Sequence, residues 1–244
     1  MKYELTPNQE DKQAFIKEIQ KHFSNSNQSI HKARNEIKII TYNGKKQTIK
    51  SFKIPHIINK IAYTFFRPSK AKKSFQNALK ILDFTPQPIG YIEFFKFGLL
   101  SKSYFVSEYF DYDFTIREPL LDKKYPNRVK IFQEFTKFTF LLHQSRIFHK
   151  DYSPGNILVK EENGTYIFKI VDINRMYFTD FTTKERLENF AKLGASDEDL
   201  KIMIQEYAML LGVDLSHIYQ EATKYSKLHQ DRIRMKQKIK KVFK

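Results

Sequence analysis

The chain of 244 residues has no cysteine, no tryptophan and only seven glycines. Without cysteine it can form neither a disulfide framework nor a cysteine-ligated metal site, which is typical of a reducing compartment. No apolar run reaches the ~18 residues that a membrane span needs, and the Met1–Leu5 start has no signal-peptide apolar region. The sequence therefore predicts a cytoplasmic protein, either soluble or peripheral on the inner face of a membrane.

Positive charge is in large excess, with 43 Lys and Arg against 27 Asp and Glu, a net charge of +16. Such a charge attracts nucleic acid, anionic membranes or phosphorylated glycolipids. The segment Lys224–Lys244 carries nine basic residues and one acidic residue, and its apolar residues fall on one helical stripe. This pattern predicts a basic amphipathic helix suited to an anionic membrane surface. The alternative is a terminal helix packed on the domain with a solvated lysine face.

The most informative motif spans residues 149–159, HKDYSPGNILV. It places Asp151 and Asn156 five residues apart, with His149 two residues before the Asp, and Asp172 follows thirteen residues after Val159. This spacing is typical of the catalytic base and magnesium ligands of kinase-like phosphotransferases. Carboxylate and amide oxygens are the hard ligands that Mg²⁺ prefers. The alternative is a polar turn between a core helix and a hairpin.

Hydrophobic patterning around the motif predicts the fold class. Asn-Gly pairs at Asn43-Gly44 and Asn163-Gly164 each lie between apolar runs and predict β-hairpins. Patterns upstream predict a helix over about 7–24 capped by Thr6, and a helix that starts after Ser69. The predicted strands are 36–41, 47–54, 91–97, 104–109, 156–160 and 166–171, and the core helix before the motif is 132–143.

These elements predict an α+β, protein-kinase-like two-lobe fold in a single domain over residues 1–244. The small lobe, an antiparallel β lobe, is expected over about 30–110, and the mainly helical large lobe over about 111–244.

The motif at 149–159, together with Val171–Arg175, resembles the lipopolysaccharide kinase family, which includes the Kdo and core heptose kinases. Segments 33–37 and 51–55 are also similar to this family, and the resemblance covers roughly residues 30–215. It implies transfer of the γ-phosphoryl group of ATP, with Mg²⁺, to a sugar hydroxyl of the lipopolysaccharide inner core. The implied partner is that core or another acidic glycolipid, and no nucleic acid is expected.

In this interpretation Asp151 is the catalytic base, and Asn156 and Asp172 hold the metal. His149 is expected to pack against the magnesium-binding segment. Arg175 has two interpretations: it contacts an acidic acceptor, or it braces the loop.

The nucleotide is expected to be held by four further residues. Lys50 matches the strand lysine that binds the phosphates, with Lys53 as the alternative on the opposite face. Gln76 stands where a glutamate is expected to pair with that lysine. Glu108 and Tyr109 lie in the segment expected to bind adenine.

Two departures from the kinase pattern keep other functions open. The first glycine is Gly44, so Lys32–Asn35 would have to cover the phosphates without a glycine-rich loop. The missing glycine-rich loop and Gln76 are the two departures, and together they favour a pseudokinase or a binding scaffold. The presence of Asp151, Asn156 and Asp172 argues against that alternative. An aminoglycoside- or choline-type small-molecule kinase is the other alternative, although its cationic acceptors suit a basic protein poorly.

Overall fold

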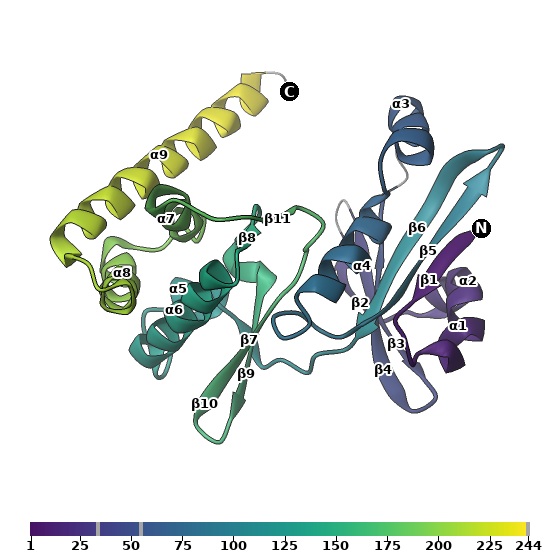
Figure 1. Cartoon of the computed structure of the whole chain (residues 1–244), viewed down its shortest axis with the longest axis horizontal. Helices are drawn as coiled ribbons and strands as arrows, with labels where there is room; N and C mark the ends of the chain where they lie inside the picture. Colours follow the sequence, from purple (N-terminus) through teal and green to yellow (C-terminus); the bar gives the residue numbers. More distant parts are fainter. Residues whose placement is uncertain (33–34, 54–55, 243–244) are drawn as a thin grey trace. The chain divides into compact units, whose positions relative to one another are not determined.

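A computed structural model describes residues 1–32, 35–53 and 56–242 (Figure 1). The chain forms two compact units. The first contains residues 1–111 and 172–174, and the second contains residues 112–171 and 175–244. Within the described residues, no helix combines the length and the apolar character that a membrane span requires.

The first unit is built on a six-stranded antiparallel sheet with strand order β1-β5-β6-β4-β3-β2. Its strands are β1 (Lys2–Leu5), β2 (Ser29–Lys32), β3 (Glu36–Tyr42), β4 (Lys45–Ser51), β5 (Pro88–Lys96) and β6 (Leu99–Glu108). Its helices are η1 (Glu10–Lys12), α1 (Gln13–Lys17), α2 (Ile19–Asn25), α3 (Ile57–Ile61), the π-helix η2 (Ala62–Phe66) and α4 (Lys70–Lys80).

Helices cover both faces of this sheet (Figure 1). On one face α1 and α2 pack Phe15 and Ile19 against Ile49 of β4. On the other face α4 packs Phe75 against Tyr91 of β5. Because side chains alternate along a strand, the residue after Ile49, which is Lys50, points to the α4 face.

The start of the chain differs from the helix expected over about 7–24. Residues 2–5 form an edge strand on β5, and Thr6 continues it: its N–H donates to the Ile89 carbonyl (2.9 Å) and its Oγ1 to the Pro88 carbonyl (2.7 Å). Thr6 therefore caps no helix, and the helical segment begins later and breaks at Glu18. Gly90 permits this pairing, because a Cβ there would lie 2.5 Å from the Glu4 carbonyl oxygen.

Both predicted Asn-Gly turns are confirmed. Asn43 and Gly44 have φ of 49° and 75°, and Asn163 and Gly164 have φ of 52° and 76°. Positive φ at both central residues gives the turn the twist of the two strands that it joins.

The second unit combines helices with a short hairpin. Its strands are β7 (Phe114–Thr115), β8 (Ile147–His149), β9 (Ile157–Glu162), β10 (Thr165–Ile170) and β11 (Met176–Phe178). Its helices are α5 (Arg117–Leu121), α6 (Arg128–Gln144), η3 (Pro154–Asn156), α7 (Thr183–Ala191), α8 (Asp197–Leu211) and α9 (Leu215–Val242). The buried core helix α6 leads through β8 directly into the motif, as the sequence predicts.

Candidate functional site

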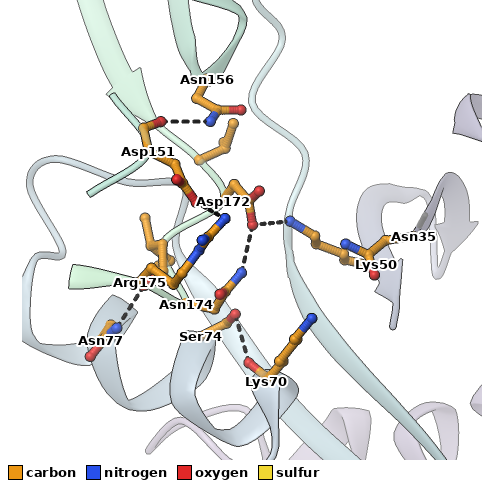
Figure 2. A network of polar contacts seen from close by, with 12 residues as sticks. Asn35, Lys50, Lys70, Ser74, Asn77, Asp151, Asn156, Asp172, Asn174 and Arg175 are labelled. Atoms are coloured by element: carbon orange, nitrogen blue, oxygen red, sulfur yellow. Dashed lines mark hydrogen bonds and ion pairs between the residues drawn. The ribbon is translucent and has the colours of Figure 1, made fainter. Parts of the chain in front are cut away.

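The loop after β8 holds Asp151 and Asn156 within the second unit. Asn156 ends η3, and its side-chain Nδ2 donates to the Asp151 carbonyl (2.9 Å; Figure 2). The backbone N–H of Asn156 donates to the Ser153 carbonyl (2.9 Å). These two bonds close the turn that brings the amide group of Asn156 back beside Asp151.

His149 braces this loop against the end of the hairpin. The Asp151 N–H donates to Nδ1 of His149 (3.1 Å), so the ring proton lies on Nε2, which donates to the Val171 carbonyl (2.9 Å). The Val171 N–H in turn donates to the Asn156 carbonyl (2.9 Å). Both backbone polar groups of Val171 are thus held by the motif, and His149 has the bracing position expected of it.

Asp172 follows Val171 by one peptide bond, about 3.8 Å between Cα atoms. Within the first unit its Oδ1 accepts hydrogen bonds from Nζ of Lys50 (2.5 Å) and from Nδ2 of Asn174 (2.7 Å; Figure 2). Its backbone is left-handed, with φ of 58°. A non-glycine residue in this region is uncommon, and such residues gather at functional sites.

The two candidate lysines are clearly separated. Lys50 reaches Asp172 from the α4 face of the sheet, whereas Lys53 is exposed after the end of β4. The backbone N–H of Lys53 donates to Oδ1 of Asn35 (3.3 Å). The geometry therefore favours Lys50. Of the segment expected to cover the phosphates, residues 33 and 34 lie outside the described part of the chain.

Helix α4 contacts the Asp172 loop through Asn77, which the sequence did not single out. The buried Nδ2 of Asn77 donates to the Ile173 carbonyl (2.6 Å; Figure 2). Gln76, predicted to face Lys50, is exposed, so that prediction is wrong. One residue turns a helix by about 100°, so Gln76 and Asn77 point in different directions. The apolar stripe of Ala71, Phe75 and Ala78 lies about equally far from both, so the sequence held no signal for Asn77; the structure buries it together with Ser74.

Arg175 contacts the candidate base. Its Nη2 forms an ion pair with Oδ2 of Asp151 (Figure 2). The Arg175 carbonyl accepts a hydrogen bond from the Lys150 N–H (3.0 Å). Of the two interpretations of Arg175, this structure shows the bracing one. A guanidinium on one carboxylate oxygen fixes the side-chain orientation of Asp151.

In the segment expected to bind adenine, two backbone N–H groups are already hydrogen-bonded within the protein. The N–H of Glu108 donates to the Gln87 carbonyl (2.8 Å), and the N–H of Tyr109 donates to the Lys46 carbonyl (3.2 Å). An adenine ring would therefore need other polar groups of Ser107–Phe110 than these two N–H groups.

The donor set fits Mg²⁺. Across the parts of the chain that the structure describes, no three His, Asp or Glu side chains gather as a metal site. The hydrogen bond to the Asp151 carbonyl uses Nδ2 of Asn156, so Oδ1 is the atom of this side chain that could bind a metal. That oxygen and the Asp172 carboxylate are each hard oxygen ligands of the type that Mg²⁺ prefers.

Comparison with known proteins supports the fold. No family model matches the chain, and no curated protein matches its sequence. The structure is similar to that of WaaP in complex with acyl carrier protein, with a TM-score of 0.61 and 12% sequence identity. The match covers 95% of this chain and 98% of the WaaP chain. The predicted α+β, kinase-like fold is thereby confirmed.

Proposed function

We propose that this protein is an ATP- and Mg²⁺-dependent kinase that phosphorylates a sugar hydroxyl, Kdo or heptose, of the lipopolysaccharide inner core. The observation that carries the proposal is that both backbone polar groups of Val171 are hydrogen-bonded to the motif, the carbonyl to His149 and the N–H to Asn156. These hydrogen bonds connect the loop of Asp151, the candidate base, to Val171, the residue before Asp172. The similarity to WaaP, a lipopolysaccharide core heptose kinase, supports the same activity.

In the proposed reaction Asp151 accepts the proton of the acceptor hydroxyl as the new O–P bond forms and the bond to the β-phosphate oxygen breaks. Arg175 holds one oxygen of Asp151, which leaves the other for the hydroxyl. Phosphoryl transfer depends mainly on positioning and charge stabilisation, so a weakly basic carboxylate is adequate.

The phosphate end of the nucleotide would be held by Lys50, Asn156 and Asp172. Bound Mg²⁺ supplies neutralisation of phosphate charge. Lys50, now paired with Asp172, has an ammonium group that can be shared with phosphate oxygens. The left-handed backbone of Asp172 fixes the direction of its carboxylate before the nucleotide arrives.

The net charge of +16 supports an anionic acceptor over the cationic acceptors of aminoglycoside- or choline-type kinases. Lipopolysaccharide core sugars carry carboxylates and phosphates and are attached to a lipid. An acceptor of this kind also explains a basic protein that works at an anionic membrane.

Helix α9 supports such a membrane contact. Its first half packs Ile218 and Ala222 into the second unit, whereas the side chains from Asp231 to Ile239 are all exposed. Exposed Met235 and Ile239 there alternate with basic residues. We therefore keep the membrane-surface role predicted for Lys224–Lys244 as part of this proposal; residues 243 and 244 lie outside the described chain.

The test is phosphate transfer from ATP to purified inner-core lipopolysaccharide or Kdo-lipid A, with Mg²⁺, for wild type and Asp151→Asn. Asp151→Asn keeps the size of the side chain and removes the base, so we expect a loss of about 100-fold or more in kcat with nucleotide affinity retained. The matched control is Asp180→Asn at a surface ion pair with Arg146, which should leave the rate unchanged.

Nucleotide binding without transfer to either glycolipid would refute the acceptor and direct the search to other hydroxyl compounds. Absence of nucleotide binding in the wild type would refute the kinase itself in favour of a scaffold.

A further inference from the structure

Apolar side chains crowd the surface of α3 and η2 in the first unit. Ile57, Ile58, Ile61, Phe65 and Phe66 form what we call the α3–η2 patch, and all are exposed, Ile58 by 79% and Phe66 by 82%. Single exposed apolar residues are normal on protein surfaces, but a contiguous group marks an interaction site. Neither the candidate active site nor α9 accounts for this group.

The patch is held in place by its own polar contacts. The Leu100 N–H donates to Oγ1 of Thr64 (3.0 Å), which donates to the Lys60 carbonyl (2.6 Å). Nη2 of Arg67 donates to Oδ1 of Asn59 (2.7 Å), and its guanidinium lies 4.3 Å from the centre of the Tyr63 ring. These bonds fasten η2 to the start of β6, so the apolar side chains project from an ordered segment.

A further apolar residue lies at the same end of the sheet. Phe97 is 92% exposed in the turn between β5 and β6, three residues before Leu100 (Figure 1). Lys96 stacks its ammonium 5.4 Å from the centre of this ring. Segments that lie in a membrane surface combine phenylalanine with lysine, because the ring enters the lipid while the amine stays at the headgroups.

The stretch of chain that carries the patch has charge of a single sign. Residues 37–82 contain eleven Lys and Arg and not one Asp or Glu. Lys60 lies within the patch segment, Arg67 directly follows it, and exposed Lys53 lies four residues before it. An anionic surface would therefore meet apolar side chains flanked by cations along the whole segment.

We propose that the α3–η2 patch inserts into the headgroup region of an anionic lipid membrane. The α3 helix has five residues, and its isoleucines are followed by two adjacent phenylalanines on the π-helix. This compact projecting group suits shallow insertion into lipid better than a docked helix, which would need a long complementary stripe. The inference goes beyond the proposed reaction, because lipid binding requires neither nucleotide nor acceptor sugar.

The absence of tryptophan gives a direct test, since Phe66→Trp creates the only indole in the full chain. With vesicles of phosphatidylethanolamine and phosphatidylglycerol, we expect its emission to shift to shorter wavelength and to become protected from acrylamide. Vesicles of phosphatidylcholine alone should produce a much smaller shift. The control is Leu121→Trp, at an equally exposed leucine of α5 outside the patch, which should not shift.

A second variant measures the contribution to affinity. Phe65→Ser with Phe66→Ser should weaken binding to the anionic vesicles by about tenfold or more, because two aromatic rings no longer leave water. These side chains are exposed, so the fold should be unchanged by circular dichroism.

Vesicle binding with no response from Phe66→Trp would overturn the proposal and assign the membrane contact to α9 alone. Dimerisation in analytical ultracentrifugation that the double serine variant abolishes, with no indole response to vesicles, would overturn it in favour of self-association. Failure of phosphate transfer, in contrast, would leave the vesicle result standing.

Discussion

Asp172 has a left-handed backbone and two hydrogen-bond donors on one carboxylate oxygen, Lys50 and Asn174. Backbone conformations of this kind cost of order 1–3 kcal/mol when surrounding contacts do not hold them. Here the bonds of Val171 hold the chain before Asp172, and the bond from Asn77 holds the Ile173 carbonyl after it. The direction of the carboxylate is therefore set by the protein before any ligand binds.

Substitutions of Lys50 and Lys53 test which of the two lysines binds the phosphates. Lys50→Met should lower kcat/KM for ATP by about 100-fold, because the variant lacks a cation for the phosphates. Lys53→Met should change it by less than about twofold, since Lys53 is exposed and outside β4. Steady-state kinetics with varied ATP would check this. Equal losses in both variants would contradict the assignment of Lys50.

Three helices of the second unit are joined at His143 of α6. Its Nε2 accepts from Nδ2 of Asn189 on α7 (3.0 Å), so Nδ1 carries the proton and donates to the Tyr207 hydroxyl on α8 (2.7 Å). Burial, with the nearby cations Arg186 and Lys192, lowers the pKa of His143 to about 3. A protonated ring would turn a second N–H toward the amide donor of Asn189.

This network predicts acid sensitivity. In the unfolded chain His143 has a pKa near 6.5 and takes up a proton as the pH falls, whereas the folded state does not until about pH 3. The free energy of unfolding should therefore decrease as the pH falls from about 6.5 toward 3. The contribution is on the order of a few kcal/mol.

Urea unfolding at a series of pH values for wild type and His143→Gln would measure this contribution. The variant should be less stable near neutral pH and should show a shallower loss of stability toward acid. An unchanged slope would mean that other groups cause the acid sensitivity.

The two Asn-Gly hairpins and the core helix α6 could be predicted from local sequence, whereas the N-terminal strand β1 could not. Asn-Gly pairs require no distant partner to turn the chain, because both residues accept positive φ. Residues 2–5 become a strand only because β5 offers an open edge more than eighty residues away. Thr6 is a good helix cap by type, yet its hydroxyl bonds to the Pro88 carbonyl.

The basic C-terminal half of α9 matters at the scale of the whole molecule. Residues 231–244 contain seven Lys and Arg and one Asp, so their removal lowers the net charge from +16 to +10. Each basic residue near an anionic membrane contributes about 1 kcal/mol, and salt weakens this attraction because it shortens the Debye length. The side chains from Asp231 to Ile239 are exposed, so their loss should not disturb the core.

Deletion of residues 231–244 should weaken binding to phosphatidylglycerol-containing vesicles by about tenfold or more and make that binding less sensitive to salt. Thermal unfolding of the deletion protein should match wild type. Vesicle sedimentation over a range of salt concentrations would check the first expectation. Unchanged sedimentation would show that α9 makes no membrane contact.

The sequence by itself determined the motif spacing, the turns, the strand alternation that places Lys50 on the face opposite Ile49, and the strong positive charge. These depend on residue types and short-range geometry. Only the tertiary structure decided that Asn77 rather than Gln76 contacts the Asp172 loop, that Arg175 pairs with Asp151, and that the α3–η2 patch stays uncovered. Such facts depend on which distant segments meet, and solvent exposure is a property of the folded chain as a whole.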